Sequence, residues 1–203
     1  MVVAETFLPL GSSLGLHPER RGPVRALEFE GWMQNEDNPR ELLGGWVVPM
    51  SPGNHRTGRA FVKLAAALDP LVVERRWELL FDARHRFPNP PDTVLFPDLA
   101  LHCVSEVPLP AGSETVHRVP DLVIELLGAE TAERDVAPQG AKFLAYQLSG
   151  VREYHYAWPD GPGAASFQLV DGVYRRLEPD AEGFVESPVL GVRLRLAPAA
   201  VRR

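Results

Sequence analysis

The stretch that decides the fold is an apolar run that carries two carboxylates, Val119-Pro120-Asp121-Leu122-Val123-Ile124-Glu125-Leu126-Leu127. A short run of this kind is typical of a strand that is buried on both faces. The segment 94–104 is also nearly all apolar, and Asp98 is its one conspicuous charge. We therefore predict that segments 94–104 and 119–127 form a central pair of strands.

The carboxylates within these strands need compensation, because a buried charge is costly without an ion pair or a metal. Adjacent strands lie about 4.8 Å apart, so Asp98 and Glu125 could share one divalent cation. Asp121 has the strand parity of Glu125 but lies about 13 Å along the strand, so we place it at the strand entrance as a turn or cap residue. The alternative is pairing with arginines such as Arg118 or Arg134, and the residues alone leave both arrangements open.

Apolar periodicity and turn residues predict further elements around this pair. Helices are expected at 25–35, from Ser51 to beyond Val72 with a kink or restart at Pro70, and at Pro138–Leu148 before Gly150. Strands are expected on both sides of Gly44-Gly45, at Trp77–Phe87, at Val151–Trp158, on both sides of Asp171-Gly172 and at 192–196. Together these elements predict one α/β (α+β) domain over 25–203, a mixed central sheet flanked by helices, after an irregular N-terminal arm over 1–24.

Composition limits the compartment and the partners. The chain has 203 residues with 45% hydrophobic residues, and its apolar runs are far shorter than a membrane span. A single cysteine, Cys103, excludes an internal disulfide and fits a reducing compartment, and the first residues do not resemble a signal peptide, so we expect a cytoplasmic protein with no membrane contact. The net charge of -6 argues against tight non-specific nucleic-acid binding but not against a metal-mediated contact.

Other reactive side chains carry weaker signals. Lys142, one of two lysines, lies one turn into the helix that follows Glu125, and from there its ammonium could reach the carboxylates. His55, His85 and His102 show no metal-ligand spacing, so we interpret them as structural or surface residues. Cys103 lies on an apolar strand and is expected to be buried and inert. The sequence contains no glycine-rich phosphate loop and no nucleophile elbow.

The ordered combination of motifs resembles the Uma-two family of restriction-endonuclease-like proteins, which have the PD-(D/E)XK fold. The resemblance covers roughly residues 25 to 196. It rests on Arg40-Glu41-Leu42-Leu43-Gly44-Gly45, Phe96-Pro97-Asp98-Leu99-Ala100, the run 119–127, Thr131, Arg134-Asp135, Lys142, Tyr146 and Gly150-Val151-Arg152-Glu153-Tyr154.

This resemblance implies a restriction-endonuclease-like fold and a catalytic set of Glu41, Asp98, Glu125 and Lys142. Asp98 and Glu125 would hold the metal, with Glu41 as an additional acidic member. The implied cofactor is Mg²⁺, with Mn²⁺ as a substitute, and the implied substrate is DNA. In typical members the lysine follows the glutamate by two residues on the strand; here Leu127 stands at that position, so Lys142 would replace it from the helix.

Three function hypotheses follow. The first is a Mg²⁺-dependent endonuclease that hydrolyses DNA phosphodiester bonds. The second is a non-catalytic nuclease-fold module that binds nucleic acid or a protein partner, which the acidic charge and the altered segment after Leu127 favour. The third is a metal hydrolase for another phosphate substrate. The alternating tail at 192–196 reads as an edge strand, so we also expect a homodimer.

Overall fold

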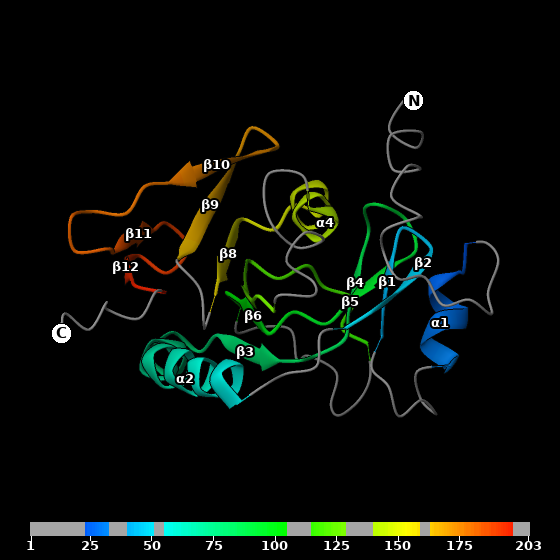
Figure 1. Cartoon of the computed structure of the whole chain (residues 1–203), viewed down its shortest axis with the longest axis horizontal. Helices are drawn as coiled ribbons and strands as arrows, with labels where there is room; N and C mark the ends of the chain where they lie inside the picture. The colour runs from blue at the N-terminus through cyan, green and yellow to red at the C-terminus, as the bar shows by residue number, and fades with distance from the viewer. Residues whose placement is uncertain are drawn as a thin grey trace.

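The computed structural model describes residues 23–32, 40–50, 55–104, 115–128, 140–158 and 163–196, with the backbone alone at residues 55 and 56. Over these ranges the chain is a mixed α+β fold of helices packed on three sheets (Figure 1). The elements are α1 (Ala26–Trp32), β1 (Arg40–Leu43), β2 (Trp46–Pro49), α2 (His55–Arg75), β3 (Glu78–Phe81), β4 (His85–Phe87), β5 (Thr93–Leu95), β6 (Leu99–His102), β7 (Leu122–Leu126), α4 (Ala141–Ser149), β8 (Glu153–Ala157), β9 (Ala164–Val170), β10 (Val173–Leu177), β11 (Val185–Ser187) and β12 (Val192–Leu194).

The largest sheet has six strands in the order β10-β9-β8-β7-β6-β3. β7 and β8 run parallel, whereas the other neighbours run antiparallel. Parallel neighbours need a crossover connection, and α4 lies on that connection. α4 ends at Gly150, whose φ of 86° is the left-handed conformation that glycine adopts without steric cost. The predicted central strand and the predicted helix end are both confirmed.

A second sheet has four strands in the order β2-β1-β5-β4. β1 and β2 form the predicted hairpin, with Gly44 and Gly45 at φ of 57° and 86° in the turn. Two successive positive φ values define the turn whose twist matches that of the flanking strands. Because β1 also pairs with β5, through Leu42 and Val94, the hairpin carries Glu41 into the interior of the sheet.

Two predicted strands are each divided between the sheets, so their predicted continuity was wrong. The segment 94–104 forms β5 in the four-stranded sheet and β6 in the six-stranded sheet, and Trp77–Phe87 forms β3 and β4 in the same two sheets. Pro97 has no backbone N–H for a ladder, and Asp82 has a φ of 46° that an extended strand does not allow. We call the two places where these segments pass from one sheet to the other crossings; one contains Asp82 and the other contains Pro97 and Asp98. The crossings are adjacent, since the Asp82 N–H donates to the Asp98 carbonyl oxygen at 3.4 Å.

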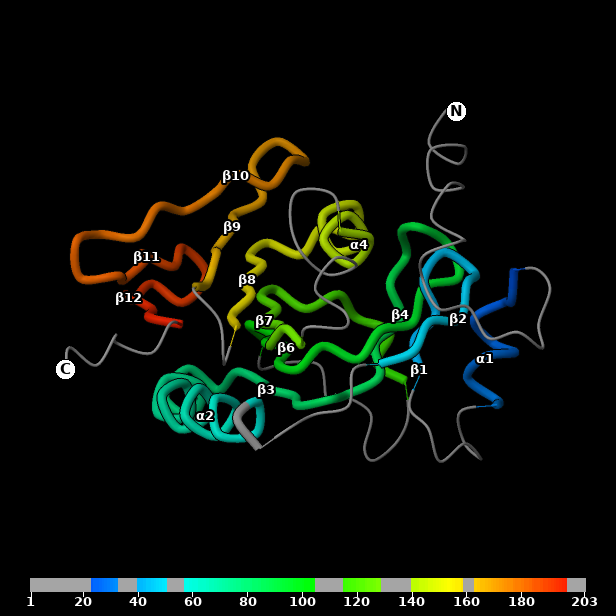
Figure 2. The backbone as a smooth tube through the Cα atoms, viewed as in Figure 1, coloured from blue at the N-terminus to red at the C-terminus, as the bar shows by residue number. Residues whose placement is uncertain are grey.

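Helices cover the two faces of the six-stranded sheet. α2 lies below the sheet in Figures 1 and 2, and α4 lies above it, between β8 and the four-stranded sheet. Leu122 and Ile124 of β7 belong to the apolar cluster that includes α2, whereas Val123 belongs to the cluster that includes α4. Strand alternation therefore places Glu125 on the face covered by α4. α2 is continuous through Pro70, so of the kink or restart predicted there the restart is excluded and the kink stays a prediction.

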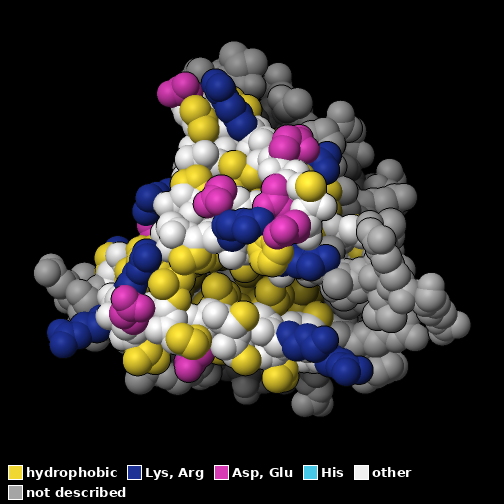
Figure 3. Space-filling view, turned by 90° about the vertical axis from the view of Figure 1, so that its left-hand side faces the viewer, with side chains coloured by type: hydrophobic (Ala, Val, Ile, Leu, Met, Phe, Trp, Pro, Cys, Tyr) yellow, Lys and Arg dark blue, Asp and Glu magenta, His cyan; other side chains and the backbone are white. Residues whose placement is uncertain are grey.

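The apolar core reaches the surface on one side of the molecule. Figure 3, which views the left-hand side of Figure 1, shows apolar side chains lining a hollow between rims of charged side chains. β11 and β12 form a separate two-stranded sheet on this side (Figure 1). The predicted strand at 192–196 is thus confirmed over Val192–Leu194. Most of the predicted arm, the predicted start of α2 at Ser51 and the segment around Arg134 lie outside the described residues.

Candidate active site

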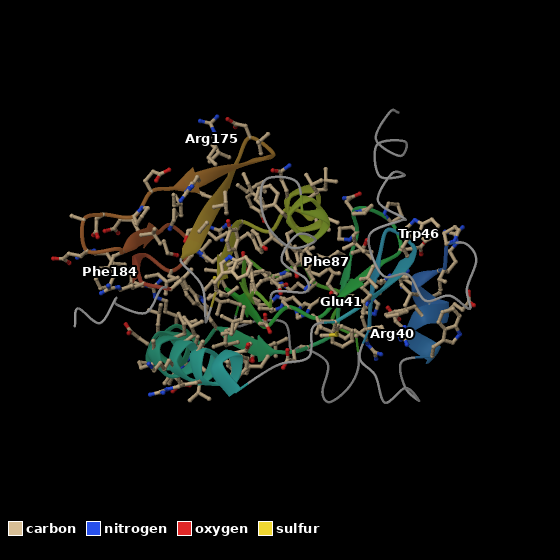
Figure 4. All side chains as sticks on the ribbon, viewed as in Figure 1. Arg40, Glu41, Trp46, Phe87, Arg175 and Phe184 are labelled. Carbon is tan, nitrogen blue, oxygen red and sulfur yellow. The ribbon has the colours of Figure 1, made fainter. Side chains whose placement is uncertain are left out.

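The candidate site lies where β1, β7 and α4 meet, between the two larger sheets. β1 brings Glu41 from the four-stranded sheet, and Figure 4 shows this residue near the centre of the molecule. β7 brings Glu125 from the six-stranded sheet, and α4 brings Lys142. The strand crossings that contain Asp82 and Asp98 end at the same junction. The fold therefore gathers acidic side chains from segments that lie far apart in the sequence.

Lys142 bridges carboxylates from the two sheets. Its Nζ lies 2.9 Å from Glu41 Oε1, and 3.0 and 3.2 Å from the two carboxylate oxygens of Glu125. The side chains of Lys142, Glu41 and Glu125 are only 4%, 1% and 5% exposed, so water cannot replace these contacts. Losing one partner of a buried ion pair leaves an uncompensated buried charge. The ammonium therefore stabilises both carboxylates at once.

Tyr146 is a second donor to Glu125. Its hydroxyl donates to Glu125 Oε1 at 2.5 Å. Tyr146 follows Lys142 by one helical turn, so both side chains project from the same face of α4. Burial, and next the negative charges of Glu125 and Glu41, raise the pKa of Tyr146 well above its ordinary value. The phenol thus stays protonated and remains a donor to the carboxylate.

Asp98 lies at the end of the second crossing, directly before β6. Leu99 pairs with Ile124, and continuing this antiparallel register places Asp98 opposite Glu125. Its Oδ2 accepts a hydrogen bond from the Leu126 N–H at 2.6 Å. Burial raises the pKa of Asp98 to about 6, against the opposing effects of that hydrogen bond and of the Lys142 charge. Asp98 is thus a carboxyl group that titrates close to neutral pH.

Asp82 is an acidic member of this region that the sequence analysis missed. Burial raises its pKa, whereas the positive charge of Lys142 lowers it, and the negative charge of Asp82 in turn raises the pKa of Asp98. The alternating pattern of Trp77–Phe87 predicts Asp82 as part of one long strand. An aspartate is one of the few non-glycine residues that tolerate a positive φ, so Phe81-Asp82-Ala83 held a signal for a strand break.

Glu41 also fixes the backbone of the crossing. Its Oε1 accepts a hydrogen bond from the Phe96 N–H at 3.0 Å, two residues before Asp98. The same oxygen contacts Lys142. Glu41, Glu125 and Lys142 are therefore joined by direct contacts, while Asp98 is linked to them through the backbone of Leu126 and through the charges of Lys142 and Glu41.

The other sequence predictions had mixed outcomes. An ion pair to Glu125 is present, but its cation is Lys142 rather than Arg118. Asp121 caps the strand entrance as predicted, accepting from the Cys103 N–H at 2.8 Å and from Arg152 at 3.1 Å. Cys103 is partly exposed rather than buried, although burial still raises its thiol pKa to about 11, which keeps it protonated.

The two buried histidines are structural, as expected. His85 Nδ1 donates to the Ala83 carbonyl at 2.7 Å. In a neutral imidazole the other ring nitrogen carries no proton, so His85 Nε2 accepts a hydrogen bond from His102 Nε2 at 3.1 Å. Burial lowers the pKa of both imidazoles to about 4, so both are neutral at neutral pH. This pair links β4 to β6 and thereby joins the two sheets. The side chain of His55 lies outside the described residues.

The donor chemistry of the site fits a hydrated divalent cation. Among the residues that the structure describes, no three His, Cys, Asp or Glu side chains are grouped in a way that could hold a metal ion. Mg²⁺, however, commonly binds through one or two carboxylates and keeps several waters. Asp98, directly before β6, and Glu125 on β7 lie at opposed positions and carry carboxylate oxygens of the kind that could hold such an ion.

The chain matches a known protein family. The family model described as "Uma2: Putative restriction endonuclease" matches residues 26–199, which is most of the chain. The chain belongs to the Uma2 family. None of the curated proteins compared with this Uma2 chain matches it. Within its described ranges, no helix is both long and apolar enough to cross a membrane.

The Uma2 chain is also similar to a solved structure. The crystal structure of "a putative nuclease belonging to DUF820 from Anabaena variabilis ATCC 29413" superposes with a TM-score of 0.69 at 17% sequence identity. The match covers 86% of this chain and 96% of the other. At this identity the likeness concerns the fold, and it confirms the predicted restriction-endonuclease-like architecture.

Proposed function

We propose that this Uma2 protein is a cytoplasmic, Mg²⁺-dependent endonuclease that hydrolyses DNA phosphodiester bonds. One observation carries the proposal: Glu41 and Glu125, which come from different sheets, contact a single buried ammonium, that of Lys142, and Asp98 lies opposite Glu125. Acidic ligands beside a lysine are the groups that metal-assisted phosphodiester hydrolysis needs. The family match supports the same reaction class.

Asp98 and Glu125 would hold Mg²⁺, or Mn²⁺ in its place, and Glu41 would act as an additional acidic member. Such an ion would polarise the phosphate and lower the pKa of a bound water. Asp98 must be ionised to act as a ligand, and its pKa of about 6 means that it is deprotonated at neutral and alkaline pH. Its position at a crossing, rather than inside a ladder, leaves it partly exposed.

Lys142 would place positive charge where the phosphate develops negative charge. A preorganised cation in a buried site stabilises such charge more than one in water does. Lys142 reaches the site from α4, because Leu127 occupies the strand position at which typical members carry their lysine. The contacts with Glu41 and Glu125 show that a lysine on α4 reaches both carboxylates.

The proposal is tested by plasmid cleavage with Mg²⁺ or Mn²⁺ and with purified Asp98→Ala. We expect cleavage by the parent protein, and loss of cleavage in the variant with a cooperative unfolding transition retained. Asp69→Ala on the exposed face of α2 is the matched control and should cleave normally. Undiminished metal-dependent cleavage by Asp98→Ala would reject this assignment.

A second candidate function is a non-catalytic module that binds nucleic acid or a protein partner. The observation that favours it is the pairing of Glu125 with both Lys142 and Tyr146, which already compensates its charge. Calorimetric titration with Mg²⁺ or Mn²⁺ separates the two functions, because absence of binding at millimolar metal would favour the non-catalytic module.

We also propose a homodimer in which the β12 edge pairs with its copy, and light scattering gives the mass that decides this.

A further inference from the structure

The ammonium of Lys142 has the environment of a bound cation. It contacts three carboxylate oxygens at 2.9 to 3.2 Å, from strands in two different sheets. Divalent cations bind carboxylate oxygens in the same way at shorter distances, about 2.0 to 2.6 Å. Two buried carboxylates with one ammonium leave one net negative charge among these three side chains.

We infer that Lys142 is an internal counter-ion that competes with a divalent cation for Glu41 and Glu125, so that cation binding releases its ammonium toward the substrate. The inference rests on the metal site of the proposed function but not on cleavage itself. It assigns Lys142 two successive positions, one on the carboxylates before a cation binds and one beside the phosphate afterwards.

The carboxylates are held by groups other than Lys142. Glu41 Oε1 accepts from the Phe96 N–H, and Glu125 Oε1 accepts from the Tyr146 hydroxyl. Both donors are uncharged, so neither repels a cation. The two carboxylates therefore keep an orienting contact when the ammonium leaves, and a cation would find them in place.

The crossing beside Lys142 offers the released ammonium a second position. The ammonium contacts Glu41 Oε1, which also accepts from the Phe96 N–H, and the partly exposed Asp98 follows Phe96 by two residues. Lysine carries its charge on a flexible four-carbon stem, which allows a new position without movement of α4. The second position of the ammonium would lie on this partly exposed side of the site.

A purely structural ion pair gives the opposite expectation for metal binding. If Lys142 only joins the sheets, its removal leaves the two carboxylates less firmly positioned. The affinity for metal and the free energy of unfolding then both fall. If Lys142 competes, its removal takes away a positive charge next to the cation and metal affinity rises. The sign of the change in affinity therefore separates the two roles.

The experiment is calorimetric titration with Mn²⁺ alone and with Mg²⁺ alone, on the parent protein and on Lys142→Met. We expect the dissociation constant of Lys142→Met to be at least about tenfold lower, since the repulsion between a unit charge and a divalent cation at about 4 Å exceeds a factor of about ten even at the dielectric constant of water. Lys63→Met, at the exposed second lysine on α2, is the matched control and should not change the constant. An equal or weaker affinity in Lys142→Met overturns the inference.

A second pair of variants covers the case in which Lys142→Met fails to fold without metal. In Glu41→Gln with Lys142→Met, the three positions carry one net negative charge, as in the parent protein. This double variant should bind Mn²⁺ at least about tenfold more tightly than Glu41→Gln alone. Equal affinities would overturn the inference.

Cleavage assays on the same proteins keep this inference separate from the proposed function. Tighter Mn²⁺ binding by Lys142→Met, together with no cleavage by the parent protein, supports the counter-ion and rejects the nuclease. Metal-dependent cleavage by the parent protein with unchanged affinity in Lys142→Met supports the nuclease and rejects the counter-ion.

Discussion

Replacement of Tyr146 by phenylalanine removes one hydrogen bond and nothing else of the buried site. The Tyr146 hydroxyl donates to Glu125 Oε1 at 2.5 Å, and both side chains are buried. A hydrogen bond to a charged group contributes about 1.5 to 3 kcal/mol, because the lost partner leaves the charge less compensated. Glu125 keeps its contacts to Lys142, so we expect Tyr146→Phe to lower the free energy of unfolding by about 2 kcal/mol.

The same molecule offers a matched control in a second buried tyrosine. The Tyr174 hydroxyl donates to the Val151 carbonyl at 2.9 Å, so its acceptor is neutral. A neutral hydrogen bond contributes about 1 kcal/mol, half of the value expected for Tyr146. Urea unfolding of both variants at pH 8 without metal measures the difference. A loss in Tyr146→Phe no larger than that in Tyr174→Phe would refute the view that the phenol stabilises the Glu125 carboxylate.

Two further predictions concern the acidic side chains. Burial raises the pKa of Asp98 from 3.8 to about 6, so the stability tied to its protonated form is present below pH 4 and is lost as the pH rises through 6. Metal-free Asp98→Asn should therefore be more stable than the parent protein by about 3 kcal/mol at pH 8 and by less than about 1 kcal/mol at pH 4, which urea titrations at both pH values will show. Glu153→Ala removes the acceptor of the Ser187 hydroxyl and of the Val189 N–H. It should lower the free energy of unfolding, measured by thermal unfolding, by about 3 kcal/mol. An equal decrease in the exposed control Glu186→Ala would contradict this.

Local rules of sequence predicted the parts of the fold that depend on neighbouring residues. Gly44-Gly45 and Asp171-Gly172 mark hairpins because their positive φ values require residues with little steric restriction. Gly150 ends α4 for the same reason. The buried strand with Glu125 was predictable because a charge within an apolar run stands out. Each of these features is decided within a few residues of sequence.

The nature of the counter-charge was not predictable in this way. The residues left a metal and arginine pairs open for Asp98 and Glu125; the structure pairs Glu125 with Lys142, and Arg134 lies outside the described residues. That contact depends on where α4 packs after the crossover, and on β1 bringing Glu41 from the other sheet. Neither distance follows from periodicity, because both depend on contacts between segments remote in sequence.

The wrong strand predictions fall at the candidate site, and one physical cause explains this. The two segments that cross from one sheet to the other join the sheets, and Glu41 and Glu125 reach Lys142 from these two sheets. Pro97 and Asp82 end strands at adjacent points, and Asp98 directly follows one of these breaks. The apolar pattern continues across each break, as alternation in Trp77–Phe87 and as a nearly unbroken run in 94–104, which is why it predicts one strand where the structure has two. Sequence rules fail at this junction because the fold departs from regular structure there in order to bring the charges together.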